Sequence, residues 1–250
     1  MFHTAAYFES QATGVTNDAL QAVTDQVLTI SNNNFLLRED RRLLYACAVG
    51  LELTNARLSS PSINVITRPS ISPLEPAALP RKYPGIADYR QQPFQLYARE
   101  ELSIETTKSS GGSTGDVWGV IGVEWNPQPA PPGPIYSLYG TATTTLTVDN
   151  WSELTDLTWT NSLPQGTYSI CGLSVYSATA IAARLIIQNQ VPRPGIVASA
   201  DVTTTQEPMF SYGEMGEYGR FESFVMPQVE VLAHTADTAQ SVVLQVIRVG

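Results

Sequence analysis

The sequence predicts an all-β protein made of two tandem eight-stranded jelly-roll barrels, with a short helical arm at the N-terminus. Three observations predict this class. Most segments after residue 43 are short, rich in Val, Ile, Thr and Tyr, and separated by Pro, Gly, Asn or Ser. The sequence also repeats itself, and a proline-rich segment lies between the two copies.

The repeat is carried by landmarks that recur in one order at a near-constant offset. The two cysteines lie about 124 positions apart, in the similar contexts Tyr45-Ala-Cys47 and Tyr168-Ser-Ile-Cys171. An Arg-Pro pair, a Tyr-x5-Tyr motif and a closing β-type run follow in each copy. Four such landmarks indicate an internal duplication. The later ones are Arg68-Pro69 and Arg193-Pro194, Tyr83 to Tyr89 and Tyr212 to Tyr218, and the runs 116–125 and 240–249.

The repeat and its boundary predict the domain organisation. Residues 126–134 hold five prolines, which remove backbone donors and keep the chain near polyproline II geometry. We therefore expect an N-terminal arm plus first jelly roll over residues 1–126, a linker over 127–134 and a second jelly roll over 135–250. The alternative is a proline-rich surface loop inside one domain.

Residues 16–28 give the one helical pattern, since Leu20, Val23, Val27 and Leu28 fall on one helical face. Thr16 or Asn17 would be the N-cap, and the helix ends before Thr24 if the following residues form a strand. Residues 1–7 are expected to be frayed. The predicted strands are 34–38, 43–53, 56–58, 63–67, 94–107 and 116–125, then 135–148, 154–159, 167–176, 180–188, 196–202, 220–224, 228–234 and 241–249.

Composition excludes several classes of function. Charged residues make up 15% of the chain, fewer than the roughly 25% of a typical soluble protein, which favours extensive protein–protein contact. The net charge is −9, and the densest basic cluster, residues 38–42, is diluted by Glu39 and Asp40, so sequence-specific nucleic-acid binding is not expected. No signal peptide or membrane span is predicted, so we expect assembly in the cytoplasm and free, buried cysteines.

The search for chemistry yields no catalytic residue, cofactor or metal ligand. His3 and His234 are the only histidines, and no Cys-x-x-Cys or His-x-His spacing exists. Paired carboxylates remain an alternative because Glu101 and Glu105 share a strand face, although outward-facing polar residues explain the same spacing. Glu222 and Glu230 are the other candidates. A sugar-stacking platform would draw on four residues, Trp118, Trp125, Trp151 and Trp159.

Taken together, the duplicated β-units, the proline linker, the sparse charge and the repeated Tyr-Cys, Arg-Pro and Tyr-x5-Tyr landmarks resemble the double jelly-roll major capsid proteins of tailless icosahedral viruses. The resemblance covers nearly the whole chain, and that family has no diagnostic residue motif. It implies a structural, non-enzymatic virion protein. Two barrels stand side by side in that family, and three copies form a pseudo-hexagonal tile.

The resemblance also implies the partners. These are further copies of the chain, as a homotrimer and then a shell lattice, together with other capsid or vertex proteins and, as a hypothesis suggested by the acidic balance, an underlying membrane. Tyr83, Tyr89 and Arg90, with Tyr212, Tyr218 and Arg220, are the expected subunit-contact residues, because aromatic residues and arginine are enriched at interfaces. Packing within their own barrel is the alternative.

Three other functions remain open at this stage. The chain would be a tandem carbohydrate-binding lectin or spike if its loop aromatics bind sugars. It would be a two-jelly-roll hydrolase if Glu101 and Glu222 are catalytic. It would be a single-jelly-roll capsid protein if the repeat is not a true duplication.

Overall fold

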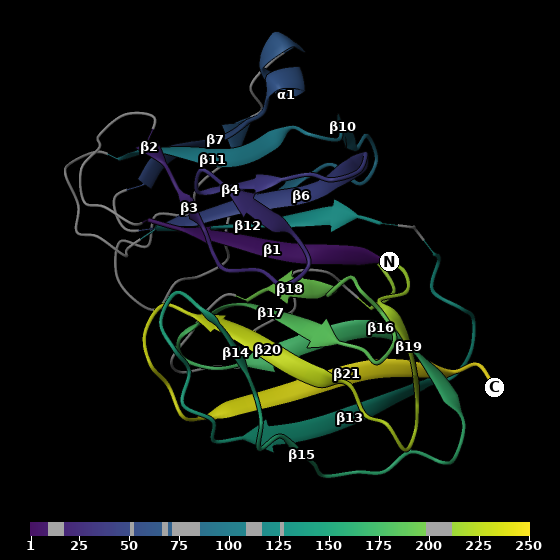
Figure 1. Cartoon of the computed structure of the whole chain (residues 1–250). Helices are drawn as coiled ribbons and strands as arrows, with labels where there is room; N and C mark the ends of the chain where they lie inside the picture. Colours follow the sequence, from purple (N-terminus) through teal and green to yellow (C-terminus); the bar gives the residue numbers. More distant parts are fainter. Residues whose placement is uncertain are drawn as a thin grey trace. The chain divides into compact units, whose positions relative to one another are not determined.

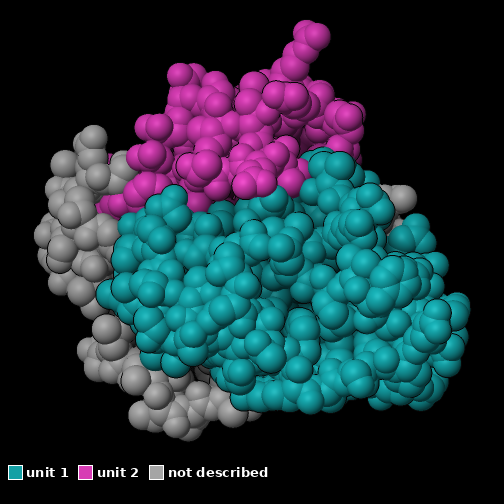
Figure 2. Space-filling model, turned by 60° about the horizontal axis from the view of Figure 1, so that its bottom comes forward, with its two compact units in different colours: residues 1–4, 125–250 teal, residues 5–124 magenta. Residues whose placement is uncertain are grey.

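The computed structural model describes residues 1–9, 18–50, 53–66, 70–71, 86–108, 117–125, 128–198 and 212–250. Nearly every element is a strand, which confirms the predicted all-β class. The chain forms two compact units, shown in different colours in Figure 2. Unit 1 contains residues 1–4 and 125–250, and unit 2 contains residues 5–124.

Unit 2 contains two sheets of antiparallel strands. One has the order β10-β6-β12-β1-β3, with β9 also paired to β6; the other has the order β4-β5-β11-β7-β8, with β2 also paired to β11 (Figure 1). The bounds are β1 Phe2–Phe8, β2 Asp18–Ala19, β3 Gln21–Ala22, β4 Thr29–Ser31, β5 Asn34–Leu36, β6 Arg41–Gly50, β7 Leu53–Ser59, α1 Pro61–Ile66, β8 Ser70–Ile71, β9 Ile86–Asp88, β10 Phe94–Leu96, β11 Glu101–Lys108 and β12 Val117–Glu124.

Unit 1 also contains two antiparallel sheets. Their orders are β15-β13-β21-β16-β19 and β14-β20-β17-β18 (Figure 1). The bounds are β13 Ile135–Ala142, β14 Trp151–Glu153, β15 Thr158–Trp159, β16 Thr167–Tyr176, β17 Ala180–Ile186, β18 Gly195–Val197, β19 Gly219–Glu222, β20 Gln228–Ala233 and β21 Gln240–Arg248.

The two units share one pairing scheme. In unit 1 the first strand, β13, pairs with the last, β21, while β14 pairs with β20, β16 with β19 and β17 with β18. In unit 2 the corresponding pairs are β1 with β12, β5 with β11, β6 with both β9 and β10, and β7 with β8. Each unit is therefore a ribbon of four strand pairs, an order that fits a jelly roll.

The cores are closed by cross-strand pairs of apolar residues. In unit 1, Leu244 of β21 lies opposite Leu138 of β13 and Leu173 of β16, and all three are buried. In unit 2, the Tyr45 ring covers Gly122 of β12, where a Cβ atom would lie 2.0 Å from the ring. Only glycine fits beneath this buried tyrosine. Cys47 and Cys171 are free and buried, as predicted.

The predicted N-terminal helical arm is wrong for the residues that the structure describes. Thr16 lies outside them, and 18–22 form β2 and β3 instead of a helix. The Leu20 amide donates to the Ile104 carbonyl and the Val23 amide to the Ala6 carbonyl, so sheet pairing satisfies the backbone. Alternate burial of Leu20 and Ala22 fits a strand as well as a helix face, and tertiary pairing decides between them.

The expectation of a frayed terminus over residues 1–7 is also wrong. Phe2–Phe8 form β1, and nearly all of its side chains are buried. His3 has no exposed surface, and its Nδ1 accepts a hydrogen bond from the Arg193 amide at 2.9 Å within unit 1. Apolar residues at successive positions are typical of a strand buried on both faces.

The predicted strand at residues 63–67 is replaced by a helix, α1, over Pro61–Ile66. Ser60 precedes Pro61 and accepts a hydrogen bond from the Ile63 amide at its Oγ, at 3.4 Å, so Ser-Pro acts as a helix start signal. Among the described residues, no helix is long and apolar enough to cross a membrane.

Three predicted strands are shorter than expected or divided. The 94–107 strand splits into β10 and β11 at a turn in which Arg99 has a φ of 71°. The 135–148 strand ends at Ala142 because the Thr143 and Thr144 amides donate to the Asp156 carboxylate and not to a neighbouring strand. Of the predicted strand 154–159, residues 158–159 form a strand, β15, and the turn at Asp156 precedes them.

Truncating Leu244 to alanine is expected to lower the free energy of unfolding by about 2–5 kcal/mol, because it leaves a cavity between Leu138 and Leu173. Urea unfolding followed by circular dichroism measures the change. The exposed Thr155→Ala variant is the control and should stay within about 0.5 kcal/mol of the wild type. Equal effects of both substitutions would contradict this description of the core.

Asp156 is expected to make the free energy of unfolding depend on pH in the acidic range. Hydrogen bonds from the Thr143 and Thr144 side chains, with one from the Thr143 amide, lower the pKa of Asp156 from 3.8 to about 2. A lowered folded-state pKa stabilises the fold fully above about pH 4, and this stabilisation is lost as the pH falls through about 2. The Asp156→Asn variant should therefore show a flatter fall in unfolding free energy between these values than the wild type. Identical slopes would exclude the effect.

Candidate functional site

The first Tyr-x5-Tyr motif lies partly outside the described residues. Tyr83 is not among them, so its predicted contact stays a prediction. Tyr89 follows β9, donates its amide to the Leu44 carbonyl and packs its ring edge-on against Phe94, with ring centroids 4.7 Å apart. Burial raises the pKa of the Tyr89 hydroxyl to about 12. This tyrosine therefore has substantial contacts within its own unit.

Arg90 is oriented by a neighbouring carboxylate. Its Nε and Nη2 donate to the two oxygens of Asp88 at 2.9 and 2.7 Å. These hydrogen bonds lower the pKa of Asp88, so the carboxylate stays ionised. The guanidinium keeps about 20% of its surface exposed.

The second motif follows the same plan in unit 1. Tyr218 is 2% exposed, donates its amide to the Ile170 carbonyl and packs edge-on against Phe2, with centroids 5.0 Å apart. Burial, together with the nearby Cys171 thiol, raises the pKa of Tyr212 to about 12. Arg220 pairs with Glu217 at 2.7 Å and remains 55% exposed.

The second tyrosines of the two motifs, Tyr89 and Tyr218, occupy matching places. In each unit, the second tyrosine of the motif bonds through its amide to the strand that carries the cysteine, β6 or β16. Tyr218 packs within its own unit and is 2% exposed, and its predicted role at a subunit contact stays a prediction. The roles of Tyr89, Arg90, Tyr212 and Arg220 at subunit contacts stay predictions.

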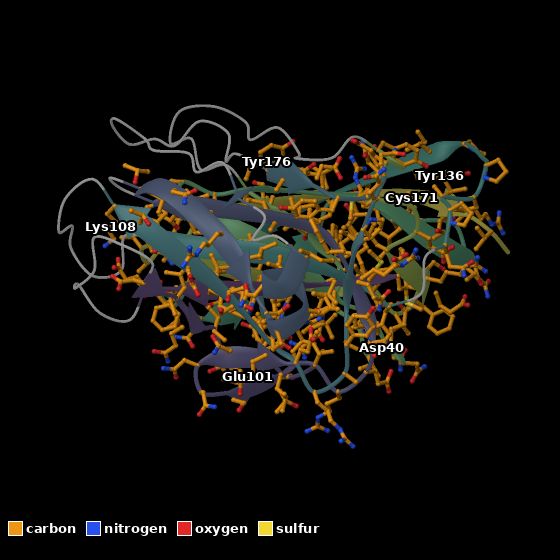
Figure 3. All side chains as sticks on the ribbon, turned by 90° about the horizontal axis from the view of Figure 1, so that it is seen from above. Asp40, Glu101, Lys108, Tyr136, Cys171 and Tyr176 are labelled. Carbon is orange, nitrogen blue, oxygen red and sulfur yellow. The ribbon has the colours of Figure 1, made fainter. Side chains whose placement is uncertain are left out.

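Unit 2 exposes one sheet face that carries charges, which we call the charged face. On β11, Glu105 pairs with Arg57 of β7 at 2.6 Å. Glu101 accepts hydrogen bonds from the side chains of Ser31 at 2.8 Å and Asn32 at 3.1 Å, and these donors lower its pKa. Figure 3 shows Glu101 and Lys108 at opposite ends of β11.

In unit 1 a different sheet exposes a face on β13, β21 and β16, and its paired outward residues carry no charge between Ser137 and Thr141 of β13. The exposed Arg248 ends β21, and the exposed Arg220 and Glu222 lie on the neighbouring strand β19. Outward side chains alternate with buried ones on β13 and β21 and pair across the two strands. β16 adds Ser174 and Tyr176 opposite β21, and Figure 3 shows Tyr176 far from Tyr136, at the other end of the sheet. We call this surface the uncharged face; its residues on β13 and β21 are Ser137, Tyr139, Thr141, Ser241, Val243 and Gln245.

Two buried ion clusters were not predicted from the sequence. In unit 1, Glu230 of β20 lies opposite Arg184 of β17 and accepts from it at 2.6 Å and from Arg193 at 2.7 Å. Arg184 also donates to the Thr4 carbonyl and stacks over Trp151 at 4.1 Å. The signal available in the sequence is a single charge inside each apolar strand, since such charges are rarely buried without a partner.

The second cluster joins Lys108 to Glu9 in unit 2. Lys108 Nζ lies 2.6 Å from a Glu9 carboxylate oxygen, and both side chains are nearly inaccessible, at 2% and 4% exposure. Breaking such a pair leaves a buried charge without compensation. Both clusters therefore fix which strand segments lie together.

The carboxylates considered for catalysis have other partners in the structure. Glu101 and Glu105 are engaged on the charged face, Glu230 lies between two arginines, and Glu222 accepts a hydrogen bond from Thr167 at 2.7 Å. A glycosidase acid needs a raised pKa, whereas that of Glu101 is lowered. Trp118 is 2% exposed, so it cannot serve a sugar platform.

Within the described part of the chain, no group of three or more His, Cys, Asp or Glu side chains is placed to hold a metal ion. Unit 1 has an open hollow of about 190 Å³ beside β19, whose lining includes Thr167, Asn189, Arg220 and Glu222. Phe221 and Val225 form part of its wall, which gives it a mixed polar and apolar character.

Comparison with known proteins gives a weak structural likeness. No family model matches the sequence, and no curated protein matches it. Among solved structures, the chain is similar to the major capsid protein P2 from bacteriophage PM2, with 9% sequence identity and a TM-score of 0.23. The alignment covers 100% of this chain and 98% of that one.

Replacing Glu230 with glutamine is expected to lower the free energy of unfolding by about 3–5 kcal/mol, because two buried guanidinium groups lose their counter-charge. Thermal and urea unfolding measure the loss. The matched control is Glu39→Gln, at a carboxylate that pairs with Arg41 and is 70% exposed, which should change stability by less than about 1 kcal/mol. A Glu230→Gln variant as stable as the control would show that the cluster contributes little.

Proposed function

We propose that this chain is a structural capsid protein made of two tandem jelly rolls that arose by internal duplication. The observation that carries the proposal is the shared pairing scheme: in both units the first strand lies beside the last, and the intervening strands pair inward in sequence. Cys47 and Cys171 lie on the corresponding strands β6 and β16, to which the Tyr89 and Tyr218 amides bond, and this supports a common origin for the two units.

A duplicated jelly roll suits a shell because of symmetry. Three copies of a two-unit chain place six similar units around a threefold axis, which gives a nearly hexagonal tile that packs in a flat lattice. The two units remain free to differ in sequence, so that each can present its own contact surface. We therefore propose a homotrimer as the building block of an icosahedral shell.

The remaining parts of the proposal follow from this role. The first jelly roll with its N-terminal segment takes residues 1–126, the linker 127–134 and the second jelly roll 135–250. The protein acts in the virion without enzymatic activity and is assembled in the host cytoplasm. It contacts other capsid or vertex proteins, and an underlying membrane in viruses that have one, without sequence-specific nucleic-acid binding.

The proposal is tested by the mass of the purified protein across a concentration series, measured by light scattering, with electron microscopy of the same samples. We expect a trimer that forms hexagonal tiles or closed shells. A monomer at every concentration, without tiles or shells, would contradict the proposal and favour the carbohydrate-binding alternative, which a glycan array then tests.

A further inference from the structure

We propose that the uncharged face of unit 1 contacts a second copy of this chain. This inference rests on the proposed function, because it identifies a surface through which the building block assembles. The face is formed by the outward side chains of β13, β21 and β16. The members named above carry hydroxyl, amide, aliphatic or aromatic side chains, and none of them is Asp, Glu, Lys, Arg or His.

Composition separates this face from an ordinary solvated sheet surface. Outward positions of a half-buried strand are commonly charged, as Glu101, Glu105 and Arg57 show on the charged face of unit 2. On the uncharged face the most exposed large residues are Ile135, at 51%, and Tyr139, at 42%. Depletion of charge and enrichment of tyrosine are typical of the buried centre of a protein interface.

The tyrosine on this face is held in place. The Tyr139 hydroxyl lies 3.1 Å from Ser241 Oγ on the neighbouring strand. The Tyr139 ring therefore loses less side-chain conformational entropy when a partner covers it. Tyr139 is therefore a fixed aromatic side chain among smaller hydroxyl residues, and it can serve as the anchor residue of a flat interface.

The partner meets the side chains of the face and does not add a strand to the sheet. β15 pairs with β13 at Gly140 and Thr141. Beyond β15, Asn161 accepts from the Tyr139 amide at 3.0 Å and donates to the Ser137 carbonyl at 2.7 Å. These contacts occupy the edge of β13, which would otherwise be free to pair with another chain.

Charge identifies the occupant as another copy. Each chain carries a formal charge of −9, so identical copies repel one another in most orientations. A face without ionisable groups is where two such chains approach with the least loss of ionic solvation. A sugar is less well suited, because ligand sites are concave, and the hollow lined by Arg220 and Glu222 includes none of the β13 or β21 residues of this face and, from β16, includes Thr167 at its first position.

The face is smaller than a stable interface, so we place it at the centre of a larger contact. Four outward residues along a strand span about 20 Å, and three strands span about 10 Å. A stable interface needs roughly 800 Å² from each partner. The uncharged face therefore supplies the core of the interface, and neighbouring loops supply its polar rim.

The test introduces one charge at a time into the full-length protein. Ser137→Lys and Ser174→Lys place a lysine on the uncharged face, and the matched control Ser103→Lys places one on the charged face, also on a strand of an exposed sheet. We expect both face variants to weaken self-association at least tenfold in light scattering. The control should assemble like the wild type, and all melting temperatures should agree within about 3 °C, which verifies folding.

The outcomes separate this inference from the proposed function. A wild type that stays monomeric overturns both. Shells or trimers that form equally well from the wild type and both face variants overturn the inference alone, as does an equal loss of assembly in Ser103→Lys. Saturable binding of a glycan by the wild type that is lost in Ser137→Lys assigns the face to a sugar and likewise overturns it.

Discussion

The pairing of the first strand of each unit with its last is the constraint on which the remaining structure depends. In unit 1, β13 and β21 share eight register pairs although Tyr139 and Ser241 are 102 positions apart. This pairing brings the two ends of the unit together, so the strands between them must fold back as nested pairs. The leucine core, the uncharged face and the Asp156 turn that ends β13 all follow from that register, because a slip of one residue would exchange the two faces.

Buried ion pairs favour this strand register over alternative registers. Apolar strands alone permit several registers, but Arg184 finds Glu230 in only one of them. Lys108 and Glu9 have the same effect in unit 2, because displacing the segment that carries either residue would leave a buried charge without its partner. Such pairs add little net stability when compared with well-packed apolar residues, yet they penalise every alternative strongly. Their main effect is on the choice of structure.

The sequence predicts the strand content well and the local exceptions poorly. β16 is predicted with its observed bounds, because alternation and β-branched residues act over the whole segment. The errors arise where another interaction wins: sheet pairing at 18–22, the Ser60-Pro61 helix start, and the capture of the Thr143 and Thr144 amides by Asp156. The uncharged face could have been found by noting which outward positions lack charge, but this requires the register that joins β13 to β21. Arg184 and Glu230 each stand out as a single charge in an apolar strand, but the sequence does not show that they are partners, because they are 46 positions apart.

The long separation between β13 and β21 also matters while the chain is being made. At roughly 5–20 residues per second, the ribosome takes on the order of 5–20 s to travel from Tyr139 to Ser241. During that interval β13 has emerged without its main partner, and the apolar side of Leu138 is open to water and to neighbouring nascent chains. On a crowded polysome, this exposure favours pairing of β13 with a strand of another nascent chain. The core of unit 1 therefore cannot close until translation has passed β21.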